Sequence, residues 1–199
     1  PSILGEVQTR EAFGRDVLML VDLSGSMDEA DFTTADGSTL TRLNAAKNVL
    51  KTFIAKRSGD RFGLILFGDA AFIQTPFTAD QQVWLSLLEE AQTGMAGQST
   101  HLGDAIGLGI KVFEQNPQPS EQQVMIVLTD GNDTGSFVEP VDAAKIAAAR
   151  GIKIYTIAMG DPTHVGEQPM DMEVVQRVSQ LTHARAFIAI DQGELDKAY

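Results

Sequence analysis

The chain has 199 residues, a length typical of one α/β domain with a substantial core, and 43% of them are hydrophobic, which excludes wholesale disorder. It has no cysteine, so disulfides, cysteine-based zinc sites and thiol catalysis are excluded. The net charge of −12 argues against nucleic acid or an anionic membrane as the main partner, and no apolar run approaches the length of a membrane span.

Strand and helix patterns alternate along the chain and predict an α/β fold: a doubly wound, mostly parallel six-stranded sheet with helices on both faces. Apolar runs predict the strands at 16–23, 61–67, 70–75, 123–129, 153–159 and 185–190. Helical periodicity predicts the helices at 43–54, 80–91, 101–113, 140–150 and 171–182. Gly68-Asp69 is typical of a two-residue hairpin turn, which makes 70–75 a short antiparallel edge strand.

No repeat, low-complexity tract or linker divides the chain, so the sequence predicts a single domain over 1–199 with its core at about 16–190. Residues 191–199 have the pattern of a last helix that is cut short at Tyr199. The connection 28–41 is long and polar. Its segment from Asp28 to Gly37 lacks the acidic spacing and closing Glu of an EF-hand loop, so a second metal site is not expected there.

The most informative segment follows the first predicted strand. Asp22-Leu23-Ser24-Gly25-Ser26 places one carboxylate and two hydroxyls at alternate positions just beyond the apolar run 17–21. Parallel sheets bind ligands beyond the carboxyl ends of their strands. These hard oxygen atoms suit a small divalent cation such as Mg²⁺ better than zinc or copper. The alternative is helix capping, because Asp and Ser after a strand commonly cap the next helix.

Two later segments add oxygen atoms at equivalent positions. Gly97–Ala105 is a polar loop that enters a predicted helix, and Thr129–Asp133 follows the apolar run 124–128. One sheet edge can bring all three loops together. The candidate metal ligands are therefore Asp22, Ser24, Ser26, Thr100 and Asp130. Three neutral hydroxyls leave the charge of the ion incompletely offset, so an open position on it can take a carboxylate.

Other polar residues near these loops have simpler explanations. The aspartates are interpreted as solvated charges, with the alternative that Asp104 and Asp133 hydrogen-bond the ligating residues. They are Asp28, Asp31, Asp36, Asp104 and Asp133. His101 has no second histidine placed to help it, since His164 and His183 fall near other loops, and a surface role is expected. Gly103, Gly107 and Gly109 lie inside a helical pattern, where close packing on the sheet explains them better than a nucleotide site does.

Catalysis is the main rival interpretation. A Mg²⁺-dependent phosphatase could use Asp22 as its nucleophile, but it would usually need a second acidic residue two positions on, where this chain has Ser24. A serine hydrolase would need a histidine paired with Ser24 or Ser26, and the pattern supplies none. The sequence therefore predicts a binding protein and not an enzyme.

The order DxSxS, then Thr ahead of Gly-Asp-Ala, then Thr-Asp-Gly resembles the metal-ion-dependent adhesion site of von Willebrand factor type A domains, with all five positions present. The resemblance implies that Mg²⁺, with Mn²⁺ or Ca²⁺ as substitutes, is held by Asp22, Ser24, Ser26, Thr100 and Asp130. It implies a protein partner that supplies a Glu or Asp carboxylate. Since the domain is acidic, such a ligand requires a bound cation to reverse the local field.

Four further segments resemble the bacterial Bat-type branch of that family, named for aerotolerance: Arg42–Lys47, Gly59–Leu64, Phe67–Ala71 and Gly103–Ile106. That branch implies a domain anchored in the bacterial inner membrane and facing the periplasm, with a role in stress tolerance. Other Bat proteins or a MoxR-type AAA+ system are the implied partners. The flanking membrane helices of that branch are not in this sequence, so we expect an excised soluble domain. The alternative within binding proteins is a secreted or surface adhesin.

Overall fold

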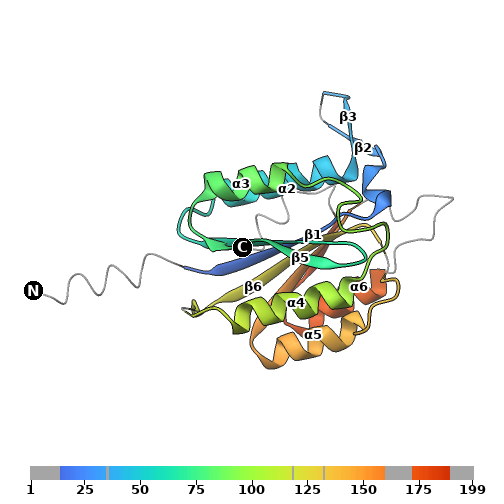
Figure 1. The fold of residues 1–199 in the computed structure, drawn as a ribbon. Coiled ribbons are helices and arrows are strands. Elements are labelled where there is room, and N and C mark those ends of the chain that lie inside the picture. Colours follow the sequence, from blue (N-terminus) through green and yellow to red (C-terminus); the bar gives the residue numbers. More distant parts are fainter. Residues whose placement is uncertain (1–13, 35, 118, 132, 160–171, 189–199) are drawn as a thin grey trace, which may run out of the picture.

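The computed structural model describes residues 14–34, 36–117, 119–131, 133–159 and 172–188. At its centre is a six-stranded sheet in the order β5-β4-β1-β6-β7-β8 (Figure 1). The strands are β1 (Asp16–Asp22), β4 (Arg61–Phe67), β5 (Ala71–Thr78), β6 (Gln123–Thr129), β7 (Ile152–Ala158) and β8 (Ala186–Ile188). Every neighbouring pair is parallel except β4 and β5. The predicted mostly parallel sheet with one antiparallel edge is confirmed.

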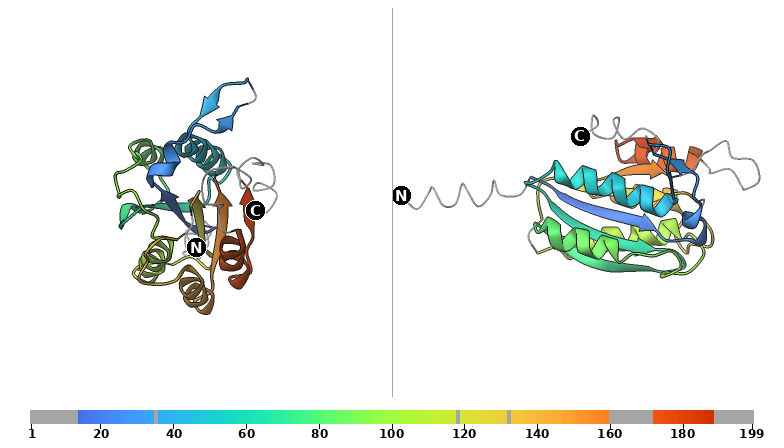
Figure 2. Two further views of the ribbon diagram at one scale, coloured as in Figure 1. Left: turned by 90° about the vertical axis from the view of Figure 1, so that its right-hand side faces the viewer. Right: turned by 90° about the horizontal axis from the view of Figure 1, so that it is seen from above.

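Helices cover both faces of this sheet (Figures 1 and 2). One face carries α2 (Arg42–Ala55) and α3 (Gln81–Glu89), and the other carries α4 (Leu102–Glu114), α5 (Pro140–Ala149) and α6 (Met172–Leu181). The central strand β1 is buried along its whole length. Its side chains alternate, with Val17 and Met19 in the core under α2 and α3 and Leu18 and Leu20 in the core under α4 and α5. This is the continuous apolar pattern of a strand with helices on both sides.

Two helix starts have a local chemical cause. The Asp80 carboxylate accepts hydrogen bonds from the backbone N–H groups of Gln82 and Val83, which caps α3. Pro140 occupies the first turn of α5, where a missing N–H costs nothing. Both starts agree with the sequence-based expectation to within one residue.

The predicted two-residue turn between β4 and β5 is wrong. Phe67 pairs with Ala71, so three residues form the connection, and β5 continues through Pro76 to Thr78 with an irregular register. The cause is a tertiary contact, because the carbonyl oxygen of Ala96 accepts hydrogen bonds from the N–H groups of Asp69 and Ala70 at 2.7 and 3.2 Å. In a two-residue turn, the N–H groups of Asp69 and Ala70 would not both be free to bond the Ala96 carbonyl.

The long polar connection after β1 contains a small hairpin that the sequence pattern did not predict. A 3₁₀ turn, η1 (Gly25–Asp28), leads to β2 (Phe32–Thr33), which pairs antiparallel with β3 (Thr39–Leu40). The hairpin projects away from the rest of the domain on the side of the sheet that α2 and α3 cover (Figures 1 and 2). The Asp36 carboxylate accepts hydrogen bonds from the Thr34 hydroxyl and from the Ser38 N–H, and these bonds lower the pKa of Asp36 to about 2.

The helix expected at 191–199 lies outside the described residues, as do the end of the last predicted strand and His164. None of the described helices has both the length and the apolar character that crossing a membrane requires.

Candidate metal centre

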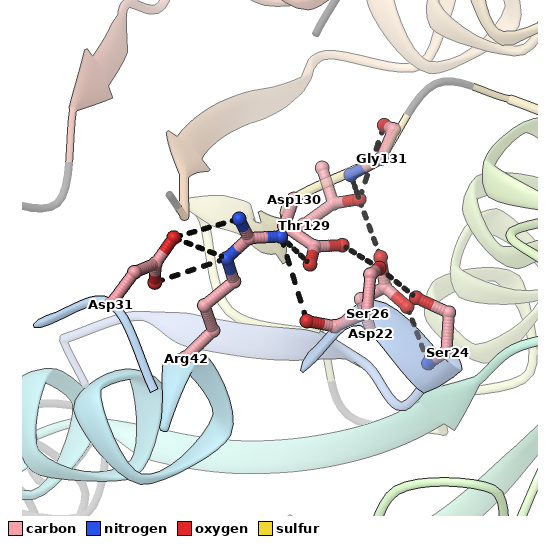
Figure 3. A network of polar contacts seen from close by, with 8 residues as sticks. All are labelled: Asp22, Ser24, Ser26, Asp31, Arg42, Thr129, Asp130 and Gly131. Atoms are coloured by element: carbon pink, nitrogen blue, oxygen red, sulfur yellow. Dashed lines mark hydrogen bonds and ion pairs between the residues drawn. The ribbon is translucent and has the colours of Figure 1, made fainter. Parts of the chain in front are cut away.

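The carboxyl ends of β1 and β6 lie side by side at one edge of the sheet, because the two strands pair directly (Figure 3). The loop before α4 reaches the same edge. Its Gly94 N–H donates to the carbonyl oxygen of Leu23 at 2.8 Å, and His101 N–H donates to the carbonyl of Gly68 at 2.9 Å. Three segments that are distant in sequence therefore meet here, as the sequence predicted.

Four of the five predicted ligands form a chain of short polar contacts. Asp22 Oδ1 accepts a hydrogen bond from the Ser24 N–H at 2.8 Å, and the hydroxyls of Ser24 and Ser26 lie 3.3 Å apart. The Ser26 hydroxyl donates to Oδ1 of Asp130 at 3.0 Å. Figure 3 shows these oxygen atoms converging from η1, β1 and the loop after β6. Ser24 does not cap η1 through its side chain, so the capping alternative has no support at this residue.

Thr100 comes to the same edge through the loop after β6. Its carbonyl oxygen accepts the Thr134 N–H at 2.7 Å, and its own N–H donates to the Thr134 hydroxyl at 3.1 Å. The Thr100 hydroxyl faces Gly131, where a Cβ atom would lie only 3.0 Å from it. Thr100 is thus placed against the residue that follows Asp130.

The Asp22 carboxylate is fully buried, and its electrostatic environment is unfavourable for a lone anion. Burial, followed by the negative charge of Asp130, raises the pKa of Asp22 to about 7, although hydrogen bonds from Ser24 and Thr129 act in the opposite direction. The Thr129 hydroxyl donates to Asp22 Oδ2 at 2.7 Å and fixes the orientation of the carboxylate.

Arg42 is the charged residue of this site that sequence reasoning missed. Its side chain is buried, and Nη1 donates to Oδ2 of Asp130 at 2.8 Å. The same guanidinium holds Asp31 through Nε and Nη2, the closest contact being 2.7 Å (Figure 3). A sequence signal existed, because an arginine in the first turn of a helix opposes the helix dipole and needs a compensating partner.

Three of the aspartates that the sequence analysis interpreted as solvated charges make specific contacts in the structure. Asp31 is not simply solvated, since it pairs with Arg42. Asp104 accepts the N–H groups of Phe137 and Val138, and Asp133 accepts the Gly103 N–H. Among the contacts of the described residues, neither of these two carboxylates hydrogen-bonds a candidate ligand, and both hold the loop that precedes α5.

The packing explanation for the glycines of α4 is correct at one position of three. A Cβ on Gly109 would lie 2.5 Å from Met125 of the sheet. Gly103 instead packs on the backbone of Val138, which belongs to a loop, and Gly107 faces open space.

The donor set fits a small divalent cation. Two buried carboxylates and a group of hydroxyls are hard oxygen ligands, and a cation would relieve the unfavourable burial of Asp22 beside Asp130. Within the described ranges, no cluster of three or more His, Cys, Asp or Glu side chains is arranged as a metal site. Three of the five candidate ligands, Ser24, Ser26 and Thr100, are neutral hydroxyls.

Comparison with known proteins agrees with this architecture. The family model of the von Willebrand factor type A domain matches residues 16–198. The structure of an uncharacterized membrane spanning protein from Vibrio fischeri is 36% identical, with 94% of this chain and 96% of that chain covered and a TM-score of 0.51. BatB from Bacteroides thetaiotaomicron has a TM-score of 0.77 over 93% of this chain and 97% of that one, and at 24% identity it shows the fold alone.

Two relatives extend the comparison to longer proteins. An uncharacterized protein of Borreliella burgdorferi is 28% identical over 162 residues, which cover 80% of this chain and 45% of that protein. A UPF0353 protein of Mycolicibacterium paratuberculosis is 26% identical over 206 residues, which cover 92% of this chain and 58% of that protein. The chain thus spans about half the length of the relatives that it matches. Because the family model covers nearly all of it, the chain belongs to the von Willebrand factor type A domain family.

Proposed function

We propose that this domain binds a partner protein through a divalent cation, with Mg²⁺ held by Asp22, Ser24, Ser26, Thr100 and Asp130. The observation that carries the proposal is the fully buried Asp22 carboxylate, which lies beside Asp130 and among hydroxyl oxygens. Mn²⁺ and Ca²⁺ are the expected substitutes, because they also prefer oxygen ligands.

The proposed role of the ion is to supply a Lewis-acidic position for a Glu or Asp carboxylate of the partner. The chain's own residues orient that position. Thr129 fixes Asp22, and Arg42 fixes Asp130, so both carboxylates are held before the ion or the partner arrives. Preorganisation of this kind reduces the ordering cost of binding. No step of this function needs a catalytic base, and we propose a binding module and not an enzyme.

The cellular setting is proposed from the relatives. One structural neighbour is described as an aerotolerance-related membrane protein from Bacteroides fragilis, with a TM-score of 0.77 at 23% identity. Together with the Bat-like sequence segments, this favours a membrane-anchored, Bat-type stress-tolerance protein whose domain faces the periplasm. Other Bat proteins or a MoxR-type AAA+ system are the proposed partners.

The deciding experiment is a calorimetric titration of Mg²⁺ and of Mn²⁺ into metal-free protein. The wild type is compared with Ser24→Ala/Ser26→Ala and with a control, Ser58→Ala/Ser86→Ala, whose serines are exposed and distant in the chain. We expect binding to the wild type and the control and its loss in the first variant. Repeating the titration with acetate tests the partner position, because a carboxylate that completes the coordination should increase the apparent affinity.

Equal Mg²⁺ affinity in all three proteins would place the ion elsewhere and reject the proposal. No binding to the wild type, with or without acetate, would reject it as well.

A further inference from the structure

Phe137 is an aromatic residue whose side chain is almost entirely in water. It is 96% exposed, whereas the other exposed large hydrophobic side chains of the described part are 37–51% exposed. Its neighbour Val138 is one of these, at 37%. An exposed apolar side chain of this size is unfavourable in isolation, and such surface marks interaction sites when it is clustered.

The loop that carries Phe137 is firmly held. Both carboxylate oxygens of Asp104 accept backbone hydrogen bonds, from the N–H groups of Phe137 and Val138 at 3.1 Å each. Asp133 accepts the Gly103 N–H at 3.1 Å and also bonds the Ser136 hydroxyl. The Val138 carbonyl oxygen approaches Gly103 so closely that a Cβ atom there would lie 1.8 Å from it. The exposed side chain therefore sits on a fixed backbone, and its burial by a partner would require little ordering of the loop.

The position of this loop relates it to the candidate metal centre. Thr134 shares three hydrogen bonds with Thr100, one of the five candidate ligands. Phe137 follows three residues later, so its Cα lies at most about 10 Å from that of Thr134. A short peptide segment can reach both the ion and Phe137.

A cavity of about 310 Å³ opens beside the loop. Ser136 and Glu139, which flank Phe137 and Val138 in the sequence, line it together with apolar side chains from α4, α5 and α6. These apolar residues are Leu102, Pro140, Val174 and Val175. These four residues give the cavity an apolar side that can receive an apolar side chain, while Asp133 and Glu139 at its wall would repel a second carboxylate.

We propose that Phe137 and this adjacent cavity form the apolar half of the partner site, and that the partner segment carries an apolar residue within a few positions of its metal-binding Glu or Asp. This inference rests on the proposed function and adds the chemical class of the segment that is recognised. Phe137 contributes contact area, and the cavity receives the partner's apolar side chain. The ion holds the partner's carboxylate and so determines which partner residue reaches the cavity.

The test uses capped synthetic peptides with one Glu in a Gly background and one Leu at one to four positions on either side of it. Matched peptides have Ser in place of Leu. Binding to ¹⁵N-labelled wild type, Phe137→Ser and Ile146→Ser is followed by NMR titration in Mg²⁺ and in EDTA. Ile146 is an exposed apolar residue of α5 and serves as the matched control. Because Phe137 is exposed, its substitution should leave the melting temperature unchanged.

In Mg²⁺ we expect at least one Leu peptide to bind the wild type and Ile146→Ser about tenfold more tightly than its Ser counterpart, and this gain to vanish in Phe137→Ser. The inference is overturned if no Leu position gives a gain, if the gain survives in Phe137→Ser, or if it persists in EDTA. It is also overturned if Phe137→Ser dissolves a concentration-dependent dimer, since the occupant would then be a second copy of this chain. The Ser peptides test the proposed function by itself, because their binding depends on the Glu and the ion alone. If they bind in Mg²⁺ and not in EDTA, the proposed function stands even when the inference about Phe137 fails.

Discussion

Arg42 and Asp130 form a buried ion pair, with Nη1 of the arginine 2.8 Å from Oδ2 of the aspartate. The pairing occupies one carboxylate oxygen of a candidate metal ligand, and it leaves the other, Oδ1, facing the Ser26 hydroxyl. Asp31 shares the same guanidinium. The amount of negative charge available to a cation at this edge is therefore set by an arginine from the first turn of α2.

Replacing Arg42 should lower the stability of the protein and raise its affinity for Mg²⁺. Arg42→Met leaves the buried Asp130 carboxylate without its ion pair, and we expect the free energy of unfolding in EDTA to fall by about 3–5 kcal/mol. Mg²⁺ affinity should rise, because the loss of a positive charge beside Asp130 outweighs the loss of the contact that orients its carboxylate. Urea unfolding with and without Mg²⁺ measures both effects.

Arg61→Met is the matched control for this experiment. Arg61 pairs with Asp16, another fully buried aspartate, at the opposite end of β1. This variant should lose stability and keep the wild-type Mg²⁺ affinity. Equal Mg²⁺ affinity in Arg42→Met and the wild type would contradict the assigned role of Arg42.

The raised pKa of Asp22 predicts how the stability of the metal-free protein depends on pH. The carboxyl titrates near 3.8 in the unfolded chain and near 7 in the folded one, so between these values the folded state holds a proton that the unfolded state has released. Stability should therefore decrease as pH rises from about 4 to 7, at up to about 1.4 kcal/mol per pH unit from this group. Asp22→Asn should remove this component of the slope.

The same variant also tests the cation. At pH 7.5 in EDTA, Asp22→Asn should be at least as stable as the wild type, because it has no buried charge to desolvate. Mg²⁺ at a hundred times its dissociation constant should stabilise the wild type by about 2.7 kcal/mol and the variant not at all. Thermal unfolding at several pH values, with Mg²⁺ or EDTA, gives the comparison. Identical pH slopes for the two proteins would contradict the assigned environment of Asp22.

Among the described contacts, hydrogen bonds link the other four candidate ligands to one another, but none links the Thr100 hydroxyl to them. Thr100→Val keeps the shape of the side chain and removes the oxygen, and we expect Mg²⁺ affinity to fall about tenfold or more. Thr100→Ser keeps the hydroxyl and should restore most of the affinity. Calorimetry on the pair distinguishes a ligand from a packing residue, since a packing role predicts that Val is tolerated better than Ser.

Two glycines of α4 should respond to alanine in opposite directions. Gly103→Ala forces a methyl group against the Val138 carbonyl, and we expect a loss of about 1–3 kcal/mol together with displacement of the loop that carries Phe137. Gly107 faces open space in the same helix, so Gly107→Ala should stabilise the protein by about 0.5–1 kcal/mol. Chemical denaturation of both variants is the measurement, and a stabilised Gly103→Ala would show that the loop does not pack as described.

The sequence predicted the elements whose causes are local. The bounds of β4 and β6 agree with the predicted strands residue for residue, because each apolar run lies between polar or glycine residues. The meeting of Asp22 and Asp130 could be predicted for a related reason, since parallel neighbouring strands end at the same edge.

The features that the sequence did not predict depend on distant contacts. The turn after β4 is set by the carbonyl of Ala96, which lies in another loop. The role of Arg42 depends on Asp130, 88 residues away, and no periodicity connects the two. The β2–β3 hairpin has strands of two residues each, too short for an alternating pattern, and its turn is held by side-chain bonds of Asp36.

The central place of β1 also has a mechanical consequence. The strand pairs with β4 from Asp16 to Asp22 and with β6 from Asp16 to Val21, and both neighbours run in the same direction. Tension applied between Asp16 and Asp22, the two ends of β1, would load both ladders in shear, so that many hydrogen bonds would have to break together. The proposed partner site would therefore lie at the end of a strand that resists tension along its own length.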